Sequence, residues 1–435
     1  MRLISVLLCL ITCGVANAAP QDFSVSVHQI ANSSTPLPDE PELIFNRFPE
    51  TPLNMTDDGL FFINAESGGF GNDSKGGVFF YSPDGDIQSI AKSRDTPFDS
   101  PTGFFDLYSD EQSSVFHAGV SSTEQSIWRI NSDNTINQLI DLETTLPDGA
   151  GSASGIRLPR ISADNVLFLG TGESSPEALY KTDTAGGPIT TLINENTRPE
   201  FANTYFDIGD FQGDRFTFRT FDRDTNSSIG VYTSDLDGNV TEIAAIGDPV
   251  PNHEDEFFFR FSGGNSFATM DDDRIAFTGQ GSGGTGGVYT TDITGDTLEV
   301  IADSTIPLPG DNGMTLGFSG PSISGDNVSF IGVGGSGRGV GLFVSVAGTI
   351  VDVIHKGDTL EGKTVDNILS GSFALHNNQV AFTIQFEDDS RGLYTANIIP
   401  APGVAGVLTI SGLWAIRRRR PRQYPSLRSA QTRRP

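Results

Sequence analysis

Apolar residues recur along the chain in short runs that end in phenylalanine. Seven runs are found, and their final phenylalanines stand 54, 52, 50, 59, 53 and 52 residues apart. These residues are Phe62, Phe116, Phe168, Phe218, Phe277, Phe330 and Phe382. A fixed period of about 50 residues is typical of repeat architectures in which each repeat forms one supersecondary unit.

Further strands are expected around each phenylalanine run. A second strand with an aromatic residue follows the run, as in Gly230-Val231-Tyr232, and a third apolar strand follows that, as in Ile243-Ala244. A looser apolar stretch precedes the run, for example Phe373-Ala374-Leu375. The short alternating runs and the turn-rich joints between them predict four strands per unit and no helical repeat.

The third apolar strand is missing after Tyr394 in the last unit, and its counterpart stands at the start of the chain. Residues Val27-His28-Gln29-Ile30-Ala31, followed by Thr35-Pro36-Leu37-Pro38, match the missing strand and turn. A ring needs such a piece, because it joins the first and last units and removes a free sheet edge. The sequence therefore predicts an all-β fold over residues 19–397. We expect a seven-bladed β-propeller of four-stranded blades, closed by the N-terminal strand.

An acidic or amide residue precedes most phenylalanine runs, where a turn is expected. These residues are Asp58, Asp164, Asp214, Asp273, Asp326 and Asn378. Asp and Asn tolerate left-handed backbone and cap turns with their own side chains, so we interpret the row as structural.

The segment Asn378-Gln379-Val380-Ala381-Phe382, with Gly392-Leu393-Tyr394 after it, resembles bacterial surface proteins with tandem repeats of the pattern Asn-x-x-Gly-x-x-Ala-Phe. The resemblance extends over nearly all of residues 20–397, although most units here lack the leading Asn and carry Asp or Asn in place of the pattern's Gly. It implies no defined activity.

Residues 1–18 have the pattern of a secretory signal peptide. Arg2 provides the positive start, Leu3 to Val15 the apolar core, and Ala16-Asn17-Ala18 a small-x-small cleavage site before Ala19. Both cysteines, Cys9 and Cys13, lie in this segment. We therefore expect the exported protein to fold without disulfides.

Residues 398–422 have the pattern of a sorting tail. Pro400-Ala401-Pro402-Gly403 precedes an apolar run to Ile416, which is followed by Arg417, Arg418, Arg419 and Arg420. A helix of nineteen residues from Ile398 would measure roughly 28 Å, barely enough to cross a bilayer core, with the arginines cytoplasmic. This order resembles the PEP-CTERM sorting signal, which implies cleavage by an exosortase-type protease and transfer to the cell surface or extracellular matrix. A permanent single-span anchor is the alternative.

Residues 423–435 are expected to be a disordered basic extension.

The charge is strongly uneven. The chain has 27 basic and 55 acidic residues, but Arg2 and eight arginines lie near its two ends, which leaves 18 basic residues against the same 55 acids between them. A net charge of about −37 in this part repels nucleic acid, and we expect no nucleic-acid partner.

Candidate chemistry along the chain is weak. Two Gly-x-Gly-x-x-Gly matches, at Gly281 and Gly332, each lead into a strand rather than a helix, so we expect hairpin loops and no dinucleotide. The five histidines fall on different repeats, and solvated or turn positions are expected for them. Acidic clusters such as Asp271-Asp272-Asp273, Asp222-Arg223-Asp224 and Asp235-x-Asp237-Gly238 lack a complete calcium loop, so structural calcium is only an alternative to ordinary turns. The run Phe257-Phe258-Phe259 exceeds what blade packing needs.

The sorting tail, the acidity and the absence of any reactive cluster favour a non-catalytic surface or matrix protein, whose propeller is an interaction or structural module. The expected partners are a processing protease and an envelope or matrix polysaccharide or protein. Two alternatives stay open: an extracellular polysaccharide hydrolase or lyase on a propeller scaffold, and a calcium-assisted adhesin. The hydrolase needs two carboxylates facing one pocket.

Overall fold

The structure is a computed structural model. It describes residues 23–45, 48, 53–64, 76–93, 98, 103–110, 113–121, 124–262, 268–310, 315–334 and 340–400. The leader, the residues after Pro400 and the cleavage positions Ala16, Ala18 and Ala19 lie outside these ranges. One compact unit spans Val25–Ile398, and the other combines Met1–Ser24 with Ile399–Pro435. The first unit contains all seven repeats.

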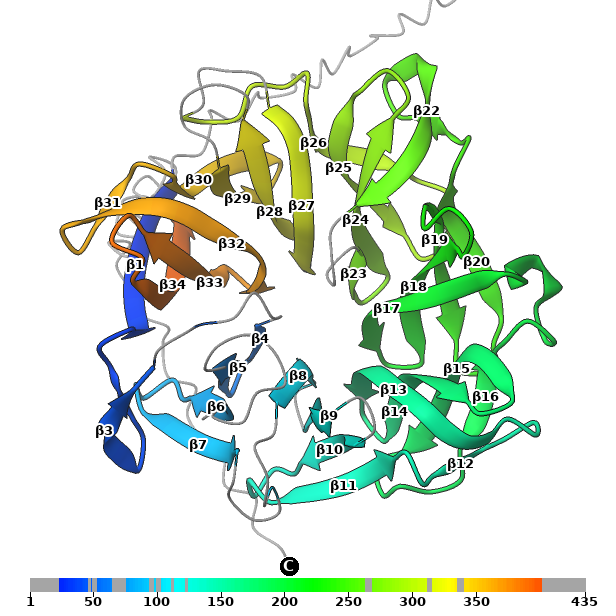
Figure 1. The fold of residues 1–435 in the computed structure, drawn as a ribbon. Helices are drawn as coiled ribbons and strands as arrows, with labels where there is room; N and C mark the ends of the chain where they lie inside the picture. The colour runs from blue at the N-terminus through cyan, green and yellow to red at the C-terminus, as the bar shows by residue number, and fades with distance from the viewer. Residues whose placement is uncertain are drawn as a thin grey trace, which may run out of the picture. The chain divides into compact units, whose positions relative to one another are not determined.

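Seven sheets are arranged in a ring in this unit (Figure 1). Blades are numbered here in chain order, and their strands run from the inside of the ring outwards. The first three blades consist of β4 (Asn54–Thr56), β5 (Gly59–Asn64), β6 (Gly77–Tyr81) and β7 (Ile87–Lys92); β8 (Gly103–Ser109), β9 (Ser114–Ser121), β10 (Glu124–Ile130) and β11 (Ile136–Asp141); and β13 (Gly151–Ser162), β14 (Asn165–Gly172), β15 (Ser175–Asp183) and β16 (Thr190–Ile193).

Blades 4 to 6 repeat the same meander. They consist of β17 (Thr204–Gln212), β18 (Arg215–Asp222), β19 (Ser228–Asp235) and β20 (Val240–Ala245); β22 (His253–Ser262) with β23 (Ala268–Asp271), then β24 (Arg274–Gly281), β25 (Gly286–Asp292) and β26 (Glu299–Asp303); and β27 (Thr315–Ser324), β28 (Asn327–Gly334), β29 (Val340–Val346) and β30 (Thr349–His355). In blade 5 both β22 and β23 pair with β24, so two segments share the innermost position.

Blade 7 is assembled from both ends of the repeat region. Its strands are β32 (Lys363–His376), β33 (Gln379–Phe386), β34 (Arg391–Pro400) and β1 (Phe23–Asn32), and β1 is hydrogen-bonded to β34. Just past β1, Ser33 donates its backbone N–H to the Arg391 carbonyl at 2.9 Å. The predicted seven-bladed propeller and its closure by the N-terminal strand are therefore confirmed.

Several short elements accompany the four-stranded meanders. In chain order between the blades stand β2 (Pro36–Leu37) and β3 (Glu40–Ile44), which form a hairpin, and the 3-10 turn η1 (Pro199–Phe201). The two-residue strands β12 (Thr145–Leu146), β21 (Pro249–Val250) and β31 (Thr359–Leu360) extend the sheets of blades 3, 5 and 7 by pairing with β13, β22 and β32. Within the described ranges no helix is long and apolar enough to cross a membrane.

The core lies between neighbouring blades rather than inside any one of them. All seven repeat phenylalanines have 0% of their surface exposed, and each stands on the second strand of its blade. At the closure, Ala374, Ala381 and Leu393 of blade 7 pack in one cluster with Phe62 and Phe79 of blade 1. A four-stranded sheet cannot bury both faces alone, so closing the ring supplies the neighbour that each face needs.

In five of the seven blades a glycine stands two residues before the third-strand aromatic and makes room for its ring. A Cβ at Gly230 would lie 2.7 Å from the Tyr232 hydroxyl, and one at Gly392 would lie 2.6 Å from the Tyr394 ring. The aromatic side chain thus covers the backbone two residues earlier in its own strand. This close approach explains the recurring Gly-x-aromatic pattern.

The acidic row lies in turns, as expected, but its left-handed backbone is not confirmed. The residues with left-handed backbone are the ones just before the row, including Ala163 (φ 50°), Asp272 (φ 50°) and Asn377 (φ 54°), together with Gly213 and Gly325. The acidic residues occupy the next position, where φ is not positive, so tolerance of left-handed backbone does not explain the row.

Candidate functional site

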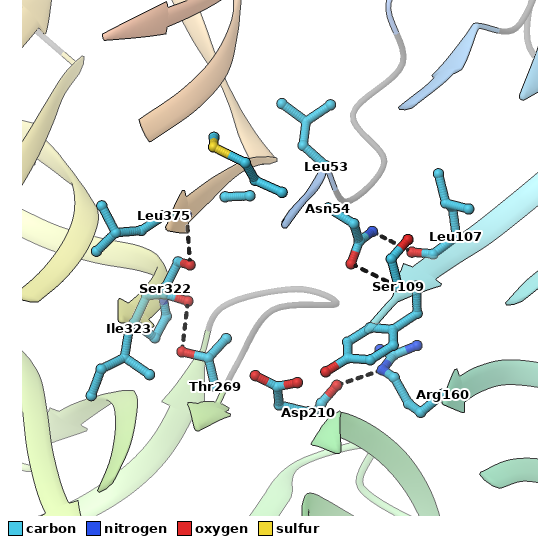
Figure 2. A pocket seen from close by; sticks show the side chains of 15 residues that line it. Leu53, Asn54, Leu107, Ser109, Arg160, Asp210, Thr269, Ser322, Ile323 and Leu375 are labelled. Atoms are coloured by element: carbon cyan, nitrogen blue, oxygen red, sulfur yellow. Dashed lines mark hydrogen bonds between the residues drawn. The ribbon is translucent and has the colours of Figure 1, made fainter. Parts of the chain in front are cut away.

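The central channel is lined by every blade, because the innermost strands converge there. It encloses about 150 Å³. Figure 2 shows the side chains that line it. One from each blade in chain order is Asn54, Tyr108, Arg160, Asp210, Thr269, Ser322 and Leu375.

Arg160 is the most constrained charge in the channel wall. Only 3% of the residue is exposed, and its guanidinium donates to the carbonyl oxygens of Pro159, Ile208 and Gly209. Its Cζ lies 5.1 Å from the centre of the Tyr108 ring. Burial lowers the pKa of Arg160 to about 10, against the opposing pull of nearby aspartates. Arg160 therefore connects blades 2, 3 and 4.

Asp210 is the carboxylate of the channel lining. Its two oxygens accept the backbone N–H groups of Phe211 at 2.9 Å and of Met270, in the next blade, at 3.0 Å. Burial raises the pKa of Asp210 to about 6, although these two hydrogen bonds oppose the shift. Among the described residues lining the channel no second carboxylate accompanies it. The carboxylate pair that a polysaccharide hydrolase would need is thus not found on these residues.

A circuit of hydrogen bonds at one mouth joins the innermost strands. At six junctions a side chain of one innermost strand, or of the turn after it, bonds a backbone group of the next blade. In the first, the Asn54 carboxamide donates to the Leu107 carbonyl at 2.7 Å. In the other five a side-chain oxygen accepts a backbone N–H: Asp110 from Ala163 (2.7 Å), Ser162 from Gly213 (2.7 Å), Asp210 from Met270 (3.0 Å), Asp271 from Gly325, and Ser324 from Asn377 (2.9 Å). The seventh junction is the pair of His376 with Asp57 at 2.7 Å. These polar residues stabilise the ring, since each satisfies a group that lies in a neighbouring blade.

A second pocket, of about 390 Å³, lies between blades 2 and 3 and is lined in part by Asp106, His117, Arg157 and Glu177. Arg157 binds Glu177 through two hydrogen bonds, at 2.9 and 3.1 Å, and Asp207 at 3.1 Å. Burial of Arg157 acts to lower the pKa of its guanidinium, but Glu177 and Asp207 outweigh burial and raise this pKa.

Asp106 is held in an unusual backbone conformation beside the same pocket. It has φ 45° and lies 3.6 Å from the ring of His117. Burial acts to raise the pKa of the Asp106 carboxyl, but the neighbouring His117 outweighs burial, and this pKa is lowered. Sequence reasoning missed this network, because its members stand on different blades without any shared spacing.

A third pocket, of about 530 Å³, lies where blade 7 meets blade 1. It is called the seam groove here and is defined by lining residues that include Asp57, Tyr81, His376, Asn378, Gln379 and Asn397. No local pattern in the sequence indicates this groove, because the two blades are joined only when the ring closes.

The histidines differ from expectation in two respects. His28 of β1 and His376 of β32 belong to the same blade and line the same groove, although we expected all five on different repeats. His117 and His355 are buried, with 8% and 2% exposed, rather than solvated. Four of the five lie beside an aspartate: His117 (Asp106, 3.6 Å), His253 (Asp303, 3.3 Å), His355 (Asp352, 2.7 Å) and His376 (Asp57, 2.7 Å).

The glycine motifs form hairpins, as predicted. Gly281 and Gly286 bound the loop between the antiparallel strands β24 and β25, and the Gly284 N–H donates to the Gly281 carbonyl at 3.0 Å. Gly332 and Gly334 stand on β28, which pairs antiparallel with β29.

The acidic clusters cap turns. Asp235 accepts N–H groups from Asp237 and Asn239, and Asp222 accepts those of Asp224 and Thr225. No group of three or more His, Cys, Asp or Glu side chains able to hold a metal is found in the described part of the chain.

The phenylalanine run on β22 is divided between core and surface. Phe258 is 1% exposed and belongs to the core between blades 4 and 5. Phe257 and Phe259 are 47% and 48% exposed, so these two rings do exceed the needs of blade packing.

Of the sorting residues, only Pro400 is described, as the last residue of β34. Ala401, Pro402, Gly403 and Arg417–Arg420 lie outside the described residues, so the tail stays a prediction.

Comparison with known proteins identifies no family for this chain. No family model and no curated protein matches the chain. Among solved structures, the β-propeller domain of the Trilobed protease from Pyrococcus furiosus is 10% identical with a TM-score of 0.48, over 80% of this chain and 94% of that one. TolB from Acinetobacter baumannii is 13% identical with a TM-score of 0.37, over 75% of this chain and 60% of that one. An acylaminoacyl peptidase from Pyrococcus horikoshii is 10% identical with a TM-score of 0.49, over 84% and 55%. The protein is a seven-bladed β-propeller, and at these identities the likeness concerns the fold alone.

Proposed function

We propose that this propeller is a non-catalytic binding or structural module that is exported and sorted to the cell surface or extracellular matrix. The carrying observation is the order of segments after the last blade. Strand β34 ends at Pro400, the first residue of the Pro400-Ala401-Pro402-Gly403 motif, and an apolar run and four arginines follow. An apolar segment with arginines behind it favours a propeller on the outer side of the membrane.

The residues of the channel support a binding role over a catalytic one. Both charged groups of its lining are engaged in hydrogen bonds to backbone groups, which stabilise the ring. The channel volume of about 150 Å³ corresponds to a handful of water molecules at ~30 Å³ each, too little for a sugar polymer. A ligand is therefore expected at the surface of the ring rather than in its centre.

The sorting proposal is tested by following the tail in cells. The full chain, with one epitope tag in a surface turn and one at the C-terminus, is expressed in a host that contains an exosortase and in the same host without it. We expect the C-terminal tag to be lost and the propeller to reach the surface or medium only when the exosortase is present. Replacing Arg417–Arg420 by alanine should abolish this processing, whereas replacing Arg428, Arg433 and Arg434 should not.

Two results would refute the sorting proposal. Retention of both tags in the membrane under all conditions would establish the permanent anchor instead. A cytoplasmic protein with its leader intact would overturn export itself.

A further inference from the structure

The seam groove is built from two distant parts of the chain. Blade 1 contributes Asp57 and Tyr81, whereas blade 7 contributes His376, Gln379 and Asn397. Its volume of about 530 Å³ lies within the range of small-ligand sites. It is more than three times as large as the central channel, at about 150 Å³.

The groove presents polar groups that the protein itself does not use. The carboxamides of Gln379 and Asn397 and the hydroxyl of Tyr81 make no side-chain hydrogen bond to any residue in the described ranges. All three residues are half-buried. A carboxamide offers two donors and an acceptor, so these groups are available to a ligand with both donors and acceptors.

Other polar groups of the groove wall already have partners in the protein. Asp57 is held by His376 at 2.7 Å, and the Asn378 carboxamide accepts from the Asn327 carboxamide of blade 6 at 2.9 Å. The backbone N–H of Asn377 donates to the Ser324 hydroxyl at 2.9 Å. Because these hydrogen bonds already restrict groups of the groove, less conformational entropy is lost when a ligand binds.

The lining restricts the chemistry of the ligand. It contains no lysine or arginine, so it has no strong anchor for a phosphate, sulfate or carboxylate, and the net charge of the chain is −28. Its apolar residues are few (Met55, Leu60 and Pro83), which disfavours lipid or an apolar peptide. Amide groups beside one tyrosine suit a ligand with many hydroxyls and an apolar ring face.

We propose that the seam groove binds a neutral oligosaccharide, with its hydroxyls bonded by Gln379 and Asn397 and a sugar ring against Tyr81. This assignment rests on the proposed function as a binding module and names its site and ligand class. Because the groove exists only where the ring closes, binding requires β1 in place.

The test is calorimetric titration of the purified full chain, kept in a sugar-free detergent. The probes are neutral hexose and N-acetylhexosamine oligosaccharides, with uronic acid oligomers as the anionic comparison. We expect at least one neutral oligosaccharide to bind, and the double variant Gln379→Ala/Asn397→Ala to bind it at least about tenfold more weakly. Asn165→Ala is the matched control, since Asn165 opens the second strand of blade 3 as Gln379 opens that of blade 7. It should bind like the wild type.

A second measurement does not depend on the variant folding. Hydrogen exchange of the wild-type protein should slow on addition of the bound oligosaccharide at residues 376–379 and 395–397. The proposal is overturned if no neutral oligosaccharide binds, if the folded double variant binds as well as the wild type, if uronic acid oligomers bind equally well, or if protection falls elsewhere. These outcomes are separate from the sorting experiment, because binding by the purified protein does not depend on how the tail is processed.

Discussion

Replacing Arg160 by methionine tests whether a buried charge stabilises this ring. Methionine keeps the length and apolar stem of the side chain but cannot donate a hydrogen bond. The change removes the three hydrogen bonds to Pro159, Ile208 and Gly209, and two of these carbonyls belong to blade 4. The hydrogen bonds of Arg160 to blade 4 would be lost, whereas the bond of Ser162 to the Gly213 N–H would remain.

Two opposing effects set the magnitude. A hydrogen bond from a charged donor contributes about 2 kcal/mol, so three contribute about 6 kcal/mol. Burial has lowered the pKa of Arg160 from 12.5 to about 10, which corresponds to about 3 kcal/mol of disfavour for the charged form that methionine would relieve. The hydrogen bonds outweigh burial, and we expect Arg160→Met to lower the free energy of unfolding by about 3 kcal/mol.

Urea unfolding followed by circular dichroism measures this difference, with an unchanged denaturant slope as the check that both proteins unfold alike. Arg274→Met is the control, because the acidic partners of Arg274, Asp326 and Glu299, are 84% and 70% exposed. It should change stability by no more than about 1 kcal/mol. Equal or greater stability of Arg160→Met would refute the reasoning, since it would mean that the burial penalty exceeds the contribution of the hydrogen bonds.

Two further predictions concern the channel carboxyl and the closure. The pKa of Asp210 is raised to about 6 by burial, so the folded state holds this proton more tightly than the unfolded state. The resulting contribution to the free energy of unfolding is complete below about pH 4 and is lost as the pH rises through about 6, a change of about 3 kcal/mol. Asp210→Asn should remove this pH dependence in unfolding curves recorded between these two pH values. An identical pH profile for the two proteins would contradict the assignment. At the closure, the Ser33 hydroxyl donates to the Arg391 carbonyl at 3.0 Å and accepts the Arg391 N–H at 2.7 Å. Ser33→Ala should lower the free energy of unfolding in urea by about 1–2 kcal/mol. The control Ser34→Ala loses only a local hydrogen bond to Asn32 and should lower it by less than half as much. Equal effects of the two changes would argue against closure at this point.

The architecture was predictable because it depends on local repetition. The seven phenylalanines mark the second strand of each blade, and every one of them is fully buried. The permuted segment Val27–Ala31 identified the closure, because a ring leaves one strand unpartnered unless the two ends of the repeat region combine. Both inferences needed only spacing and the period of the apolar pattern.

The candidate sites were not predictable, because they arise between repeats. His28 and His376 are 348 positions apart and became neighbours in one groove only through ring closure. The contact of Arg160 with Ile208 and Gly209 joins two blades in the same way. No spacing in the chain encodes such contacts, since blade orientation and not sequence distance decides which side chains meet.

The sequence by itself determined the number of blades, the strand that closes them and the expected export and sorting segments, since each follows from a local pattern of residue types. Only the tertiary structure decided where polar groups converge. It engaged the channel charges in hydrogen bonds between blades, and it left the amides of Gln379 and Asn397 in the seam groove without a partner in the described part of the chain. The physical reason is that strand patterns depend on neighbours along the chain, whereas a site depends on how packed sheets bring distant side chains together.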